Sequence, residues 1–526
     1  MEQCAQDTLL GIDVGTSGCK VGLFDLEGTL RGEAYRPYPL IHPRIDWVEE
    51  DPLQGWWKAA SEGVREALFR SNILAESIRG ISISCTNALV CVDKNGAPLR
   101  NALMQIDRRS ILQAEALRRT VGEEKIFGIT GNRVAPGTFS APLILWLKEN
   151  EPRIFEQTHK FLVPTGFLIH QLTGEYVMDW SRGATTLLFE TGGSRSWSTN
   201  LCEAMDIPME KLPRLCPSWE VVGEVTRWAS RETGLAAGTP VVAGAMDTVA
   251  AALGSGVVSN GESFYILGSV GRICLCLQEP SFDIRFINTC HCIPDYWISI
   301  ACTNGAGLSL RWFKEQLGES ETARSRETGE SPFRLLDLEA MKSPPGANKL
   351  LYLPYLAGER SPIWDPYARG VLFGLTTGHR KGDLVRAFLE GVAFAARDNF
   401  DTFEGILSKR IDEVKMSGGG SRSALWREIT SDILEKELAV LDLPDTETFG
   451  NALLAGFGTG IYCNIRETCK VLAKVGVRVR PSDANARLYS ELYRLYKRIY
   501  IHLREDFRAL EAITLRDGKV FFSQGG

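Results

Sequence analysis

The segment DVGTSGCK at residues 13–20 carries the residue types that bind phosphate groups. Its glycines permit a tight turn whose backbone N–H groups face an anion, and its hydroxyls add further donors. Lys20 is able to neutralise phosphate charge, and Asp13 is able to hold a hydrated Mg²⁺ ion. A hairpin with polar turn residues explains the same pattern, so the segment alone leaves both interpretations open. The candidate positions are Asp13, Gly15, Thr16, Ser17, Gly18 and Lys20.

Two further glycine-containing segments lie in the second half of the chain. GSVG at 268–271 has the ingredients of the first segment with fewer charges, and a simple hairpin is again the alternative. MSGGGSRS at 416–423 follows a VKM strand and precedes an expected helix, which is a common nucleotide-binding arrangement, although a flexible loop is possible there too. The candidates for phosphate and adenosine contacts are Gly268, Ser269, Gly418, Gly419 and Ser423.

A carboxylate stands at the end of an apolar strand in VVAGAMDT at 241–248. A carboxylate in this position is able to enter a cleft and accept a proton as a general base. Asp247 also precedes TVAAALG, which has a helical pattern, so an N-cap is the competing interpretation. One residue is able to serve both purposes.

The sequence pattern predicts alternating strands and helices that position the candidate site residues. The first phosphate segment separates two apolar strands, and 264–276 repeats this hairpin about half a chain length later. The recurrence suggests two related domains, although short glycine hairpins also match by chance. The polar stretch 318–331 is expected to be an exposed loop. Expected strands are 9–15, 20–28, 81–84 and 90–93, and expected helices are 53–70, 141–150, 385–399 and 486–511.

Composition places the chain among ordinary soluble proteins, since 44% of its 526 residues are hydrophobic and 24% are charged. This length favours two large domains. A net charge of -6 argues against a nucleic-acid partner, which needs a basic face. We see no secretory start and no apolar run near the ~18 residues of a membrane helix. We therefore expect a cytoplasmic protein with no membrane and no nucleic-acid partner.

The 13 cysteines are expected to be free thiols in a reducing compartment. Cys274, Cys276 and the CHC triplet at 290–292 lie close enough in sequence to suggest a zinc site. Two buried strands, each with its thiols on one face, explain the same spacing, and this interpretation is favoured. The chain has no G-x-x-x-x-G-K-[ST], no H-E-x-x-H and no G-x-S-x-G, which disfavours common NTPases, zinc proteases and serine hydrolases.

Taken in order, these segments resemble the FGGY carbohydrate kinase family, and xylulokinase-type members most closely. The resemblance runs from about residue 9 to about residue 490, and its strongest stretch is LPYLAGERSPIWDPYARGVLFGLTTGH at 353–379. Further matches are DWVEEDP at 46–52, APLILWLKENEP at 141–152, LTGEYVMDWS at 172–181, RAFLEGVAFAARDNF at 386–400 and SGGGSRSALWREITSDIL at 417–434.

The resemblance implies an α/β fold of two actin- and hexokinase-like (ribonuclease H-like) ATPase domains with a central cleft. Each domain would hold a five-stranded mixed sheet. Residues 1–253 would form the N-terminal domain, with the sugar site, the first phosphate loop and the catalytic carboxylate. Residues 254–526 would bind the nucleotide and end in a C-terminal helix. The family also implies ATP and Mg²⁺ as cofactors, and a homodimer as a frequent assembly.

By position, the resemblance makes Asp247 the catalytic base and adds Gly307, in NGAGLSLRWF, to the nucleotide-facing residues. The sugar contacts that it implies are Thr86, Asn87, Asp107, Arg109, Asp247 and Thr248.

Four departures from the family pattern affect the sugar-binding half of the implied active site. Xylulokinases typically have Gln-Met-His-Gly where this chain has CTNA at 85–88, so Asn87 replaces a sugar-contacting His. Thr248 replaces the Asn that usually follows the catalytic Asp, and Leu143 replaces a Lys before Trp146. QIDRR at 105–109 stands for a WNDQR-like segment and keeps an Asp and an Arg. The acceptor implied is a ketopentose such as xylulose, or a related sugar, polyol or aldonate.

The implied reaction is in-line transfer of the γ-phosphoryl group of ATP to a sugar hydroxyl whose proton Asp247 accepts. Such catalysis rests on positioning and electrostatic stabilisation. A non-catalytic sugar or nucleotide sensor on the same fold is the alternative from another class, and a sugar-independent actin-like ATPase is a third. A carboxylate at 247 favours the enzyme over the sensor, and the stretch 353–400 argues against the ATPase motor.

Overall fold

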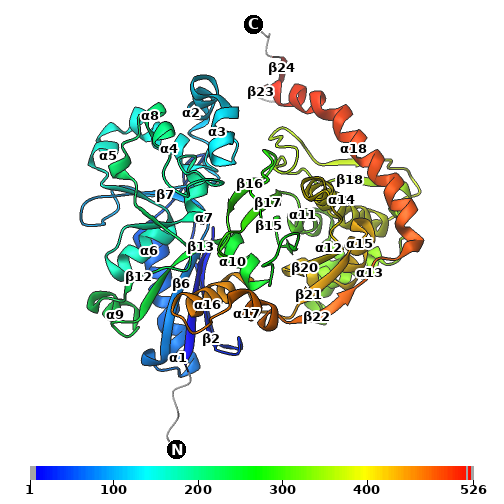
Figure 1. Ribbon diagram of the computed structural model, residues 1–526. Helices are drawn as coiled ribbons and strands as arrows, with labels where there is room; N and C mark the ends of the chain where they lie inside the picture. The colour runs from blue at the N-terminus through cyan, green and yellow to red at the C-terminus, as the bar shows by residue number, and fades with distance from the viewer. Residues whose placement is uncertain (1–6, 517–518, 523–526) are drawn as a thin grey trace, which may run out of the picture. The chain divides into compact units, whose positions relative to one another are not determined.

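The structure, a computed structural model, describes residues 7–516 and 519–522, which form two compact units (Figure 1). The first unit comprises the chain up to Asn260 together with 276–299 and 443–474. The second comprises 261–275, 300–442 and the chain from Val475 onwards. A single boundary between residues 253 and 254 therefore does not describe the compact units, because two later segments pack with the first.

A six-stranded sheet of order β12-β13-β6-β1-β2-β3 organises the first unit. β1 pairs antiparallel with β2 and parallel with β6, and β13 continues the sheet parallel to β6. β12 adds an antiparallel edge strand to the five-stranded sheet expected from the family. These strands are β1 (Thr8–Val14), β2 (Gly18–Asp25), β3 (Leu30–Pro37), β6 (Ile78–Cys85), β12 (Val221–Glu224) and β13 (Pro240–Met246).

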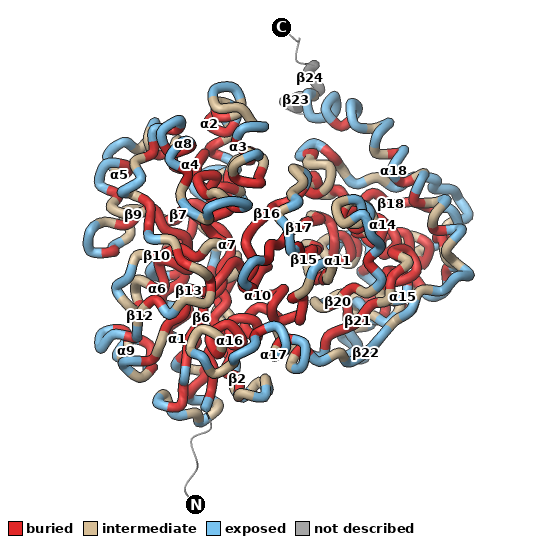
Figure 2. The backbone as a smooth tube through the Cα atoms, in the orientation of Figure 1, coloured by how far each residue is buried: buried red, intermediate tan, exposed pale blue. Residues whose placement is uncertain are grey.

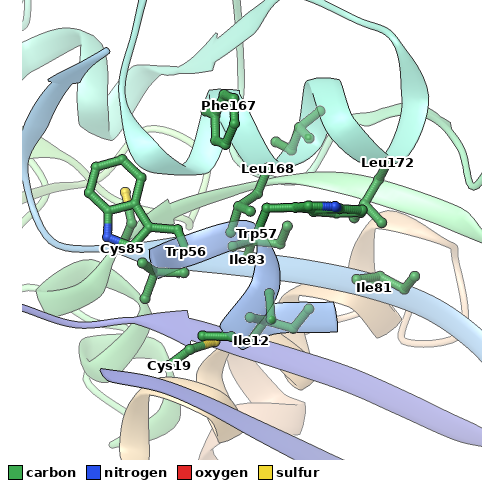
Figure 3. Close-up of a cluster of buried hydrophobic side chains, with 14 of the residues drawn as sticks. Ile12, Cys19, Trp56, Trp57, Ile81, Ile83, Cys85, Phe167, Leu168 and Leu172 are labelled. Atoms are coloured by element: carbon green, nitrogen blue, oxygen red, sulfur yellow. The ribbon is translucent and has the colours of Figure 1, made fainter. Parts of the chain in front are cut away.

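Apolar side chains from two helical segments cover one face of this sheet (Figure 3). Ile12 and Ile83 project from the strands, and Trp57 and Leu168 meet them from η1 (Pro52–Trp57) and α6 (Pro164–Thr173). All four side chains are buried, so this layer forms the core of the first unit. Each buried side chain of this size is worth ~1.5–3 kcal/mol.

The opposite side of the sheet is approached by α16 (Thr446–Gly458), a helix more than 420 residues later in the sequence than β1. In Figure 1 the orange α16 lies beside the blue strands, and Figure 2 shows it as buried as β6 and β13. A Cβ atom on Gly11 would lie 2.0 Å from the carbonyl oxygen of Thr448. A glycine in the middle of β1 is therefore what allows this helix to pack so closely.

A second small sheet and several helices complete the first unit. The sheet has the order β4-β5-β8-β7-β9. Its strands are Ile41–Arg44, Trp47–Glu50, Ala102–Met104, Ala88–Val92 and Lys160–Leu162, in that order. Other elements are α1 (Lys58–Ser71), α2 (Ile111–Leu117), α3 (Glu123–Thr130), α4 (Ser140–Asn150), α5 (Pro152–Gln157), β10 (Val177–Asp179), α7 (Trp180–Gly183), α8 (Thr199–Ala204), β11 (Arg214–Cys216), α9 (Arg227–Thr233), α10 (Asp247–Gly254), β16 (Ile287–Cys290) and α17 (Ile465–Leu472).

The second unit repeats the strand order of the first. Its sheet runs β17-β15-β14-β20-β21-β22, so a glycine hairpin is again followed by two parallel strands and an antiparallel edge strand. The shared topology confirms that the two glycine hairpins belong to two related domains. The strands are β14 (Ser263–Leu267), β15 (Gly271–Leu277), β17 (Trp297–Thr303), β20 (Glu413–Ser417), β21 (Glu437–Leu441) and β22 (Val475–Val479).

Long helices flank the sheet of the second unit. The helices expected at 385–399 and 486–511 are confirmed as the longer α14 (Lys381–Leu407) and α18 (Asp483–Ala512). The remaining elements are α11 (Gly307–Leu317), α13 (Pro332–Ala340), β18 (Leu351–Leu353), β19 (Val371–Phe373), α15 (Ala424–Leu434), β23 (Ile513–Arg516) and β24 (Lys519–Phe522). Among the described residues, no helix is long and apolar enough to cross a membrane.

The prediction of an exposed loop at 318–331 is wrong, because Glu319–Thr328 forms the helix α12. Glu319 and Glu321 occupy its first turn and Arg326 its last, which complements the helix dipole. Gly329, with φ at 74°, ends the helix in the left-handed conformation. Composition suggested a loop because the segment has no apolar stripe, whereas its ends and its helix-forming residues decide otherwise.

We expect Gly450→Ala to lower the free energy of unfolding by about 1–3 kcal/mol, because overpacking a close helix contact costs that much. A Cβ at this position in α16 would lie 1.9 Å from the carbonyl oxygen of Ala250 in α10. Thermal and urea unfolding measure the change. Gly405→Ala in α14 is the matched control, since nothing lies within 4 Å of a Cβ there, and it should stabilise by about 0.4–1 kcal/mol. Equal effects of the two substitutions would contradict the packing argument.

Candidate active site

The turn between β1 and β2 is the first candidate phosphate loop. It is closed by a hydrogen bond of 2.9 Å from the Gly15 N–H to the Gly18 carbonyl. The Tyr38 hydroxyl donates to the carbonyl of Gly15 at 2.6 Å, which holds the turn from outside. A Cβ on Gly18 would lie 2.5 Å from the Tyr35 ring, so a larger residue there would require the Tyr35 side chain to shift. Thr16 and Ser17 lie at the accessible tip.

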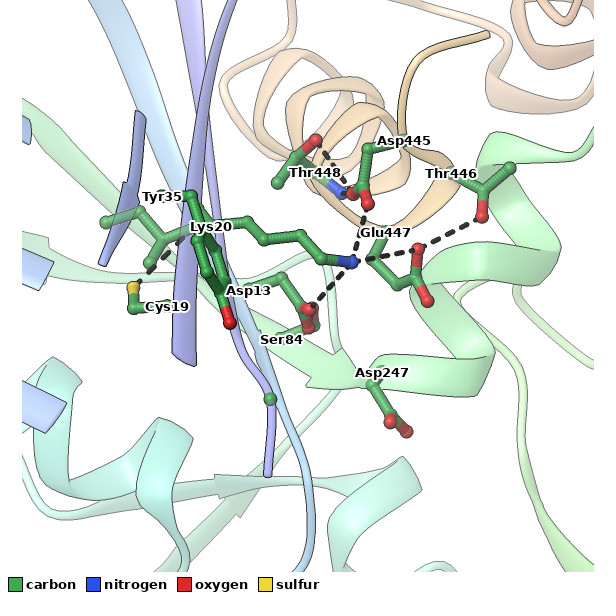
Figure 4. A network of polar contacts seen from close by, with 12 residues as sticks. Asp13, Cys19, Lys20, Tyr35, Ser84, Asp247, Asp445, Thr446, Glu447 and Thr448 are labelled. Atoms are coloured by element: carbon green, nitrogen blue, oxygen red, sulfur yellow. Dashed lines mark hydrogen bonds and ion pairs between the residues drawn. The ribbon is translucent and has the colours of Figure 1, made fainter. Parts of the chain in front are cut away.

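A charged cluster lies beside this turn, on the first two strands and the start of α16 (Figure 4). The Lys20 ammonium donates to Asp445 at 2.6 Å and lies 3.7 Å from Asp13 and 3.8 Å from Glu447. Ser84 at the end of β6 donates to Asp13 at 2.7 Å. One cation thus holds three carboxylates from two distant parts of the chain.

The surroundings of Asp13 bring the pKa of its carboxyl group close to neutral pH. Burial raises the pKa of Asp13 to about 7, Lys20 opposes this rise, and the neighbouring carboxylates Glu447, Asp445 and Asp247 add to it. A carboxyl group of this kind gains charge readily when a further cation approaches. Mg²⁺ that arrives with a nucleotide takes one or two protein carboxylates and keeps several waters, so Asp13 fits such a site.

Asp247 begins α10 at the carboxyl end of β13. Its Oδ1 atom accepts hydrogen bonds from the backbone N–H of Thr248 at 2.7 Å and from the Thr248 hydroxyl at 3.1 Å. The N-cap position belongs to Met246, so Asp247 lies in the first helical turn and is not the cap. The side chain of Asp247 stays 23% exposed, which leaves it accessible to a ligand.

Two of the residues that are expected to contact the sugar, Thr86 and Asn87, directly follow β6, the strand that pairs with β13. Thr86 accepts a hydrogen bond of 2.8 Å from Gln105, and Asn87 donates to the carbonyl of Thr138 at 2.8 Å. Asn87 Oδ1 is buried and has no hydrogen-bond donor within the described part of the chain. An unsatisfied buried acceptor of this kind is a place for a ligand hydroxyl.

Asp107 and Arg109 form a buried pair that builds the loop they lie on. Asp107 accepts from the backbone N–H of Val48 and from the Arg109 guanidinium, at 2.7 to 2.9 Å. Arg109 also donates to Glu49 at 2.8 Å. Both oxygens of Asp107 are thus engaged, whereas Arg109 Nη1 has no acceptor among the described residues. A sugar contact at this pair would therefore come from Arg109.

The second unit contains a cavity of about 740 Å³. The size suits a nucleoside, since ligand pockets commonly enclose ~300–1,000 Å³. Five of the expected residues line it, and Arg311, Arg334 and Asp337 line it as well. Those five are Gly268, Ser269, Gly307, Gly419 and Ser423.

The glycine segments of the second unit shape this cavity. The Gly307 N–H donates to the Gly268 carbonyl at 2.9 Å, and a Cβ on Gly307 would lie 2.6 Å from that oxygen. Gly418 has a φ of 93° and turns β20 toward α15, whose N-cap is Ser423. No atom lies within 4 Å of where a Cβ on Gly419 would be, so this position opens into the cavity.

Sequence reasoning missed several residues of the site. Asp445 and Glu447 reach Lys20 only through the packing of α16, although the Asp445-x-x-Thr448 spacing is a signal for a helix N-cap. Arg311, which donates to Ser269, carries no local signal at all. Arg182 lies 3.9 Å from Asp247 and was likewise not singled out.

The zinc interpretation of the cysteine cluster is not supported. No group of three or more His, Cys, Asp or Glu side chains that could hold a metal is present in residues 7–516 and 519–522. Burial raises the pKa of Cys274 and of Cys290, in the latter case to about 12, and a raised pKa disfavours the thiolate that zinc requires. Burial lowers the pKa of His291 to about 4, and its Nε2 lies 2.8 Å from the Val257 carbonyl.

Two related domains, each with a glycine turn between antiparallel strands, and a nucleoside-sized cavity in the second are typical of an ATP-using phosphotransferase of the actin and hexokinase fold class. Comparison with known proteins gives the family. The model for the N-terminal domain of the FGGY family of carbohydrate kinases matches residues 8–254, and the model for its C-terminal domain matches 267–459. The chain belongs to the FGGY family of carbohydrate kinases.

Curated relatives and solved structures agree with this membership. The chain is 32% identical to the xylulose kinase of Bacillus subtilis over 96% of its own length and 99% of that protein. It is 29% identical to the gluconokinase of Bacillus subtilis over 93% of its length and 94% of that protein. The crystal structure of xylulose kinase from Rhodospirillum rubrum superposes with a TM-score of 0.84 at 29% identity, over 95% and 100% of the two chains. The protein is thus an ATP- and Mg²⁺-dependent sugar kinase.

We expect Lys20→Met to lower the unfolding temperature more at pH 8 than at pH 6. Because the folded-state pKa of Asp13 lies above its ordinary value of 3.8, ionising Asp13 destabilises the folded state as the pH rises through about 7. Lys20 offsets part of this loss, but only when Asp13 is charged. Thermal unfolding at the two pH values measures the difference.

The double variant Asp13→Asn/Lys20→Met is the control for this pH dependence. It removes the titrating carboxyl group, so its loss of stability should vary less between pH 6 and pH 8. A Lys20→Met variant with the same loss at both pH values would contradict the assignment.

We expect Gly419→Leu to raise the Kd for ATP at least ~10-fold while the unfolding temperature stays unchanged, because the side chain fills the cavity without meeting protein atoms. Isothermal titration with ATP in Mg²⁺ measures the affinity. Gly405→Leu is the matched control, since its Cβ also has nothing within 4 Å but lies on an exposed helix position. Unchanged ATP affinity in Gly419→Leu would exclude this cavity as the nucleotide site.

Proposed function

We propose that Asp247 is the general base of the kinase and that the acceptor is a ketopentose such as xylulose or a related neutral sugar. The observation that carries the proposal is the state of Asp247: its carboxylate is oriented by Thr248 and is still 23% exposed. A base must reach the hydroxyl proton within hydrogen-bond distance, and this combination of fixed orientation and access meets that need.

The other candidate residues would bind the phosphates, the Mg²⁺ ion and the nucleoside of ATP. The 15–18 turn and Lys20 bind phosphate oxygens, and Asp13 would hold the hydrated Mg²⁺ that neutralises their charge. The cavity lined by Gly268, Ser269 and Gly419 binds the nucleoside, where Ser423 caps the adjoining helix. Because phosphoryl transfer needs little covalent help from protein, these positioning contacts supply most of the rate enhancement.

The choice of sugar is supported by relatives that are named xylulose kinases, among them the one from Bacillus subtilis. Asn87 and Thr248, which depart from the xylulokinase pattern, are the residues whose contacts would set any difference in preference. The sensor alternative is not favoured, since the carboxylate and both glycine turns are retained.

Two further expectations concern the setting of the enzyme. Among the described residues, 11 cysteines are buried free thiols, which suits a reducing compartment. We propose that the protein acts in the cytoplasm. We also propose a homodimer, as implied by the family, which sedimentation of the purified protein would test.

The experiment that tests the function is ATP consumption with Mg²⁺ across ketopentoses, ketohexoses, polyols and aldonates, with a sugar-free blank. We expect strong stimulation by one neutral sugar and little turnover in the blank. Turnover that no sugar increases would contradict the kinase assignment and point to an ATPase.

We expect Asp247→Ala and Asp247→Asn to lower kcat for sugar phosphorylation by about 10²–10⁴ because the base is lost. ATP affinity should change less than about twofold, since the nucleotide cavity is lined by other residues. Coupled ADP release and isothermal titration measure the two quantities. Asp412→Ala, an 83% exposed carboxylate, is the matched control and should keep full activity. Full phosphorylation activity in Asp247→Ala would refute the role of Asp247.

A further inference from the structure

Arg182 is a fully buried cation next to the proposed base. It lies in α7 (Trp180–Gly183), its side chain is 0% exposed, and its Nη2 atom is 3.9 Å from Asp247 Oδ1. Its Nε, Nη1 and Nη2 atoms have no hydrogen-bond acceptor among the residues that the structure describes. A guanidinium group carries five N–H donors, so nearly its whole donor capacity is unused.

An unsatisfied buried guanidinium is costly, because a charged donor removed from water loses its hydration without compensation. Buried polar groups in native structures are almost always paired with protein, ordered water, an ion or a ligand, so Arg182 needs a partner from outside the chain. Arg182 lies beside Asp247, the proposed base, so the ligand nearest to it is the molecule on which that base would act.

The surrounding backbone holds Arg182 firmly in place. Asp179 caps α7 by accepting from the N–H of Ser181 at 2.8 Å and from the N–H of Arg182 at 3.3 Å. The Ser181 hydroxyl accepts from the N–H of Met246 at 2.8 Å, the residue before Asp247. The helix that carries the cation is therefore tied to the strand that carries the base.

The charges around Arg182 decide what kind of ligand fits. Asp247 faces it, and Asp179, whose pKa burial raises to about 6 while Ser181 and Arg182 lower it, is charged for the most part at neutral pH. The thiol of Cys85, whose pKa burial raises, stays neutral. Arg182 thus already has two carboxylates near it and lacks hydrogen-bond acceptors, not negative charge.

Arg109, another buried cation among the residues expected to contact the sugar, is also paired with carboxylates. Its partners are Asp107 and Glu49. A substrate carboxylate would add a further negative charge to this set. A neutral hydroxyl would accept from Arg182 without that cost, and it is also able to donate, as the unsatisfied Asn87 Oδ1 requires.

We propose that Arg182 is a specificity-determining residue that donates to the substrate hydroxyl on the carbon next to the phosphorylated one, and that the site therefore takes neutral sugars or polyols in preference to aldonates. The inference rests on the proposed role of Asp247. The hydroxyl that reacts lies against Asp247, and hydroxyls on adjacent carbons are a hydrogen-bond length apart, so the next one falls within reach of the guanidinium.

The test compares two substrates in two proteins. The substrates are the neutral sugar that stimulates the wild type most and its deoxy analogue without the neighbouring hydroxyl. Wild type should lose about 10- to 100-fold in kcat/KM on the deoxy analogue, because an unpaired buried donor rejects it. In Arg182→Met this penalty should shrink to less than about threefold, since the donor is gone.

Arg182→Lys keeps the charge but not the planar fork, so it should retain part of the discrimination. If Arg182→Met does not fold, Asp179→Asn/Arg182→Met is the replacement, because Asn also caps a helix and removes the uncompensated carboxylate. Arg79→Met, a 55% exposed arginine, is the matched control and should keep the wild-type penalty.

Three results would overturn the inference. An undiminished deoxy penalty in the Arg182 variants would show that another residue reads this hydroxyl. A wild type that prefers an aldonate, with that preference lost in Arg182→Met, would show that Arg182 binds a carboxylate. A wild type that phosphorylates no sugar in the panel would remove the proposed function itself, and this outcome is distinct because it appears before any variant is compared.

Discussion

The close packing of α16 against the first sheet is the constraint on which the first unit depends. Gly11 in β1 has no side chain that would keep the helix away from the sheet, and Gly450 in α16 allows α10 to pack closely on the same helix. Asn451 then reaches β1, donating to the Ile12 carbonyl at 2.9 Å. The same approach delivers Asp445 and Glu447 to Lys20, so a packing requirement and an electrostatic one are met by a single helix.

Each unit uses its sheet in the same way. A glycine turn joins two antiparallel strands, and candidate site residues lie in or after the strands that pair in parallel beside it. In the first unit the candidates are Asp13 in β1 and Asp247 directly after β13, held by Ser84 and Thr248. In the second they are the glycines around the nucleoside-sized cavity. A duplicated topology has thus diverged into a carboxylate-rich site and a glycine-rich cavity.

The charge pattern of the first unit separates two kinds of task. Lys20 balances three carboxylates beside the turn between β1 and β2. Arg182 lies beside Asp247, and both Arg182 and Asn87 have buried polar atoms without partners among the described residues. Buried polar atoms of this kind are informative because native structures pair nearly all of them with protein, ordered water, an ion or a ligand.

The sequence by itself determined the local chemistry: the glycine turns, the strand that ends at Asp247, the Gly-rich turn capped by Ser423 and the recurrence of one hairpin in both halves. These depend on residues within a few positions of one another, so their patterns are readable. The boundaries of the units, the partners of Lys20, the isolation of the Arg182 guanidinium and the engagement of Asp107 were decided by tertiary structure alone. They arise from contacts between segments up to several hundred residues apart, and such contacts leave no periodicity or spacing in the sequence.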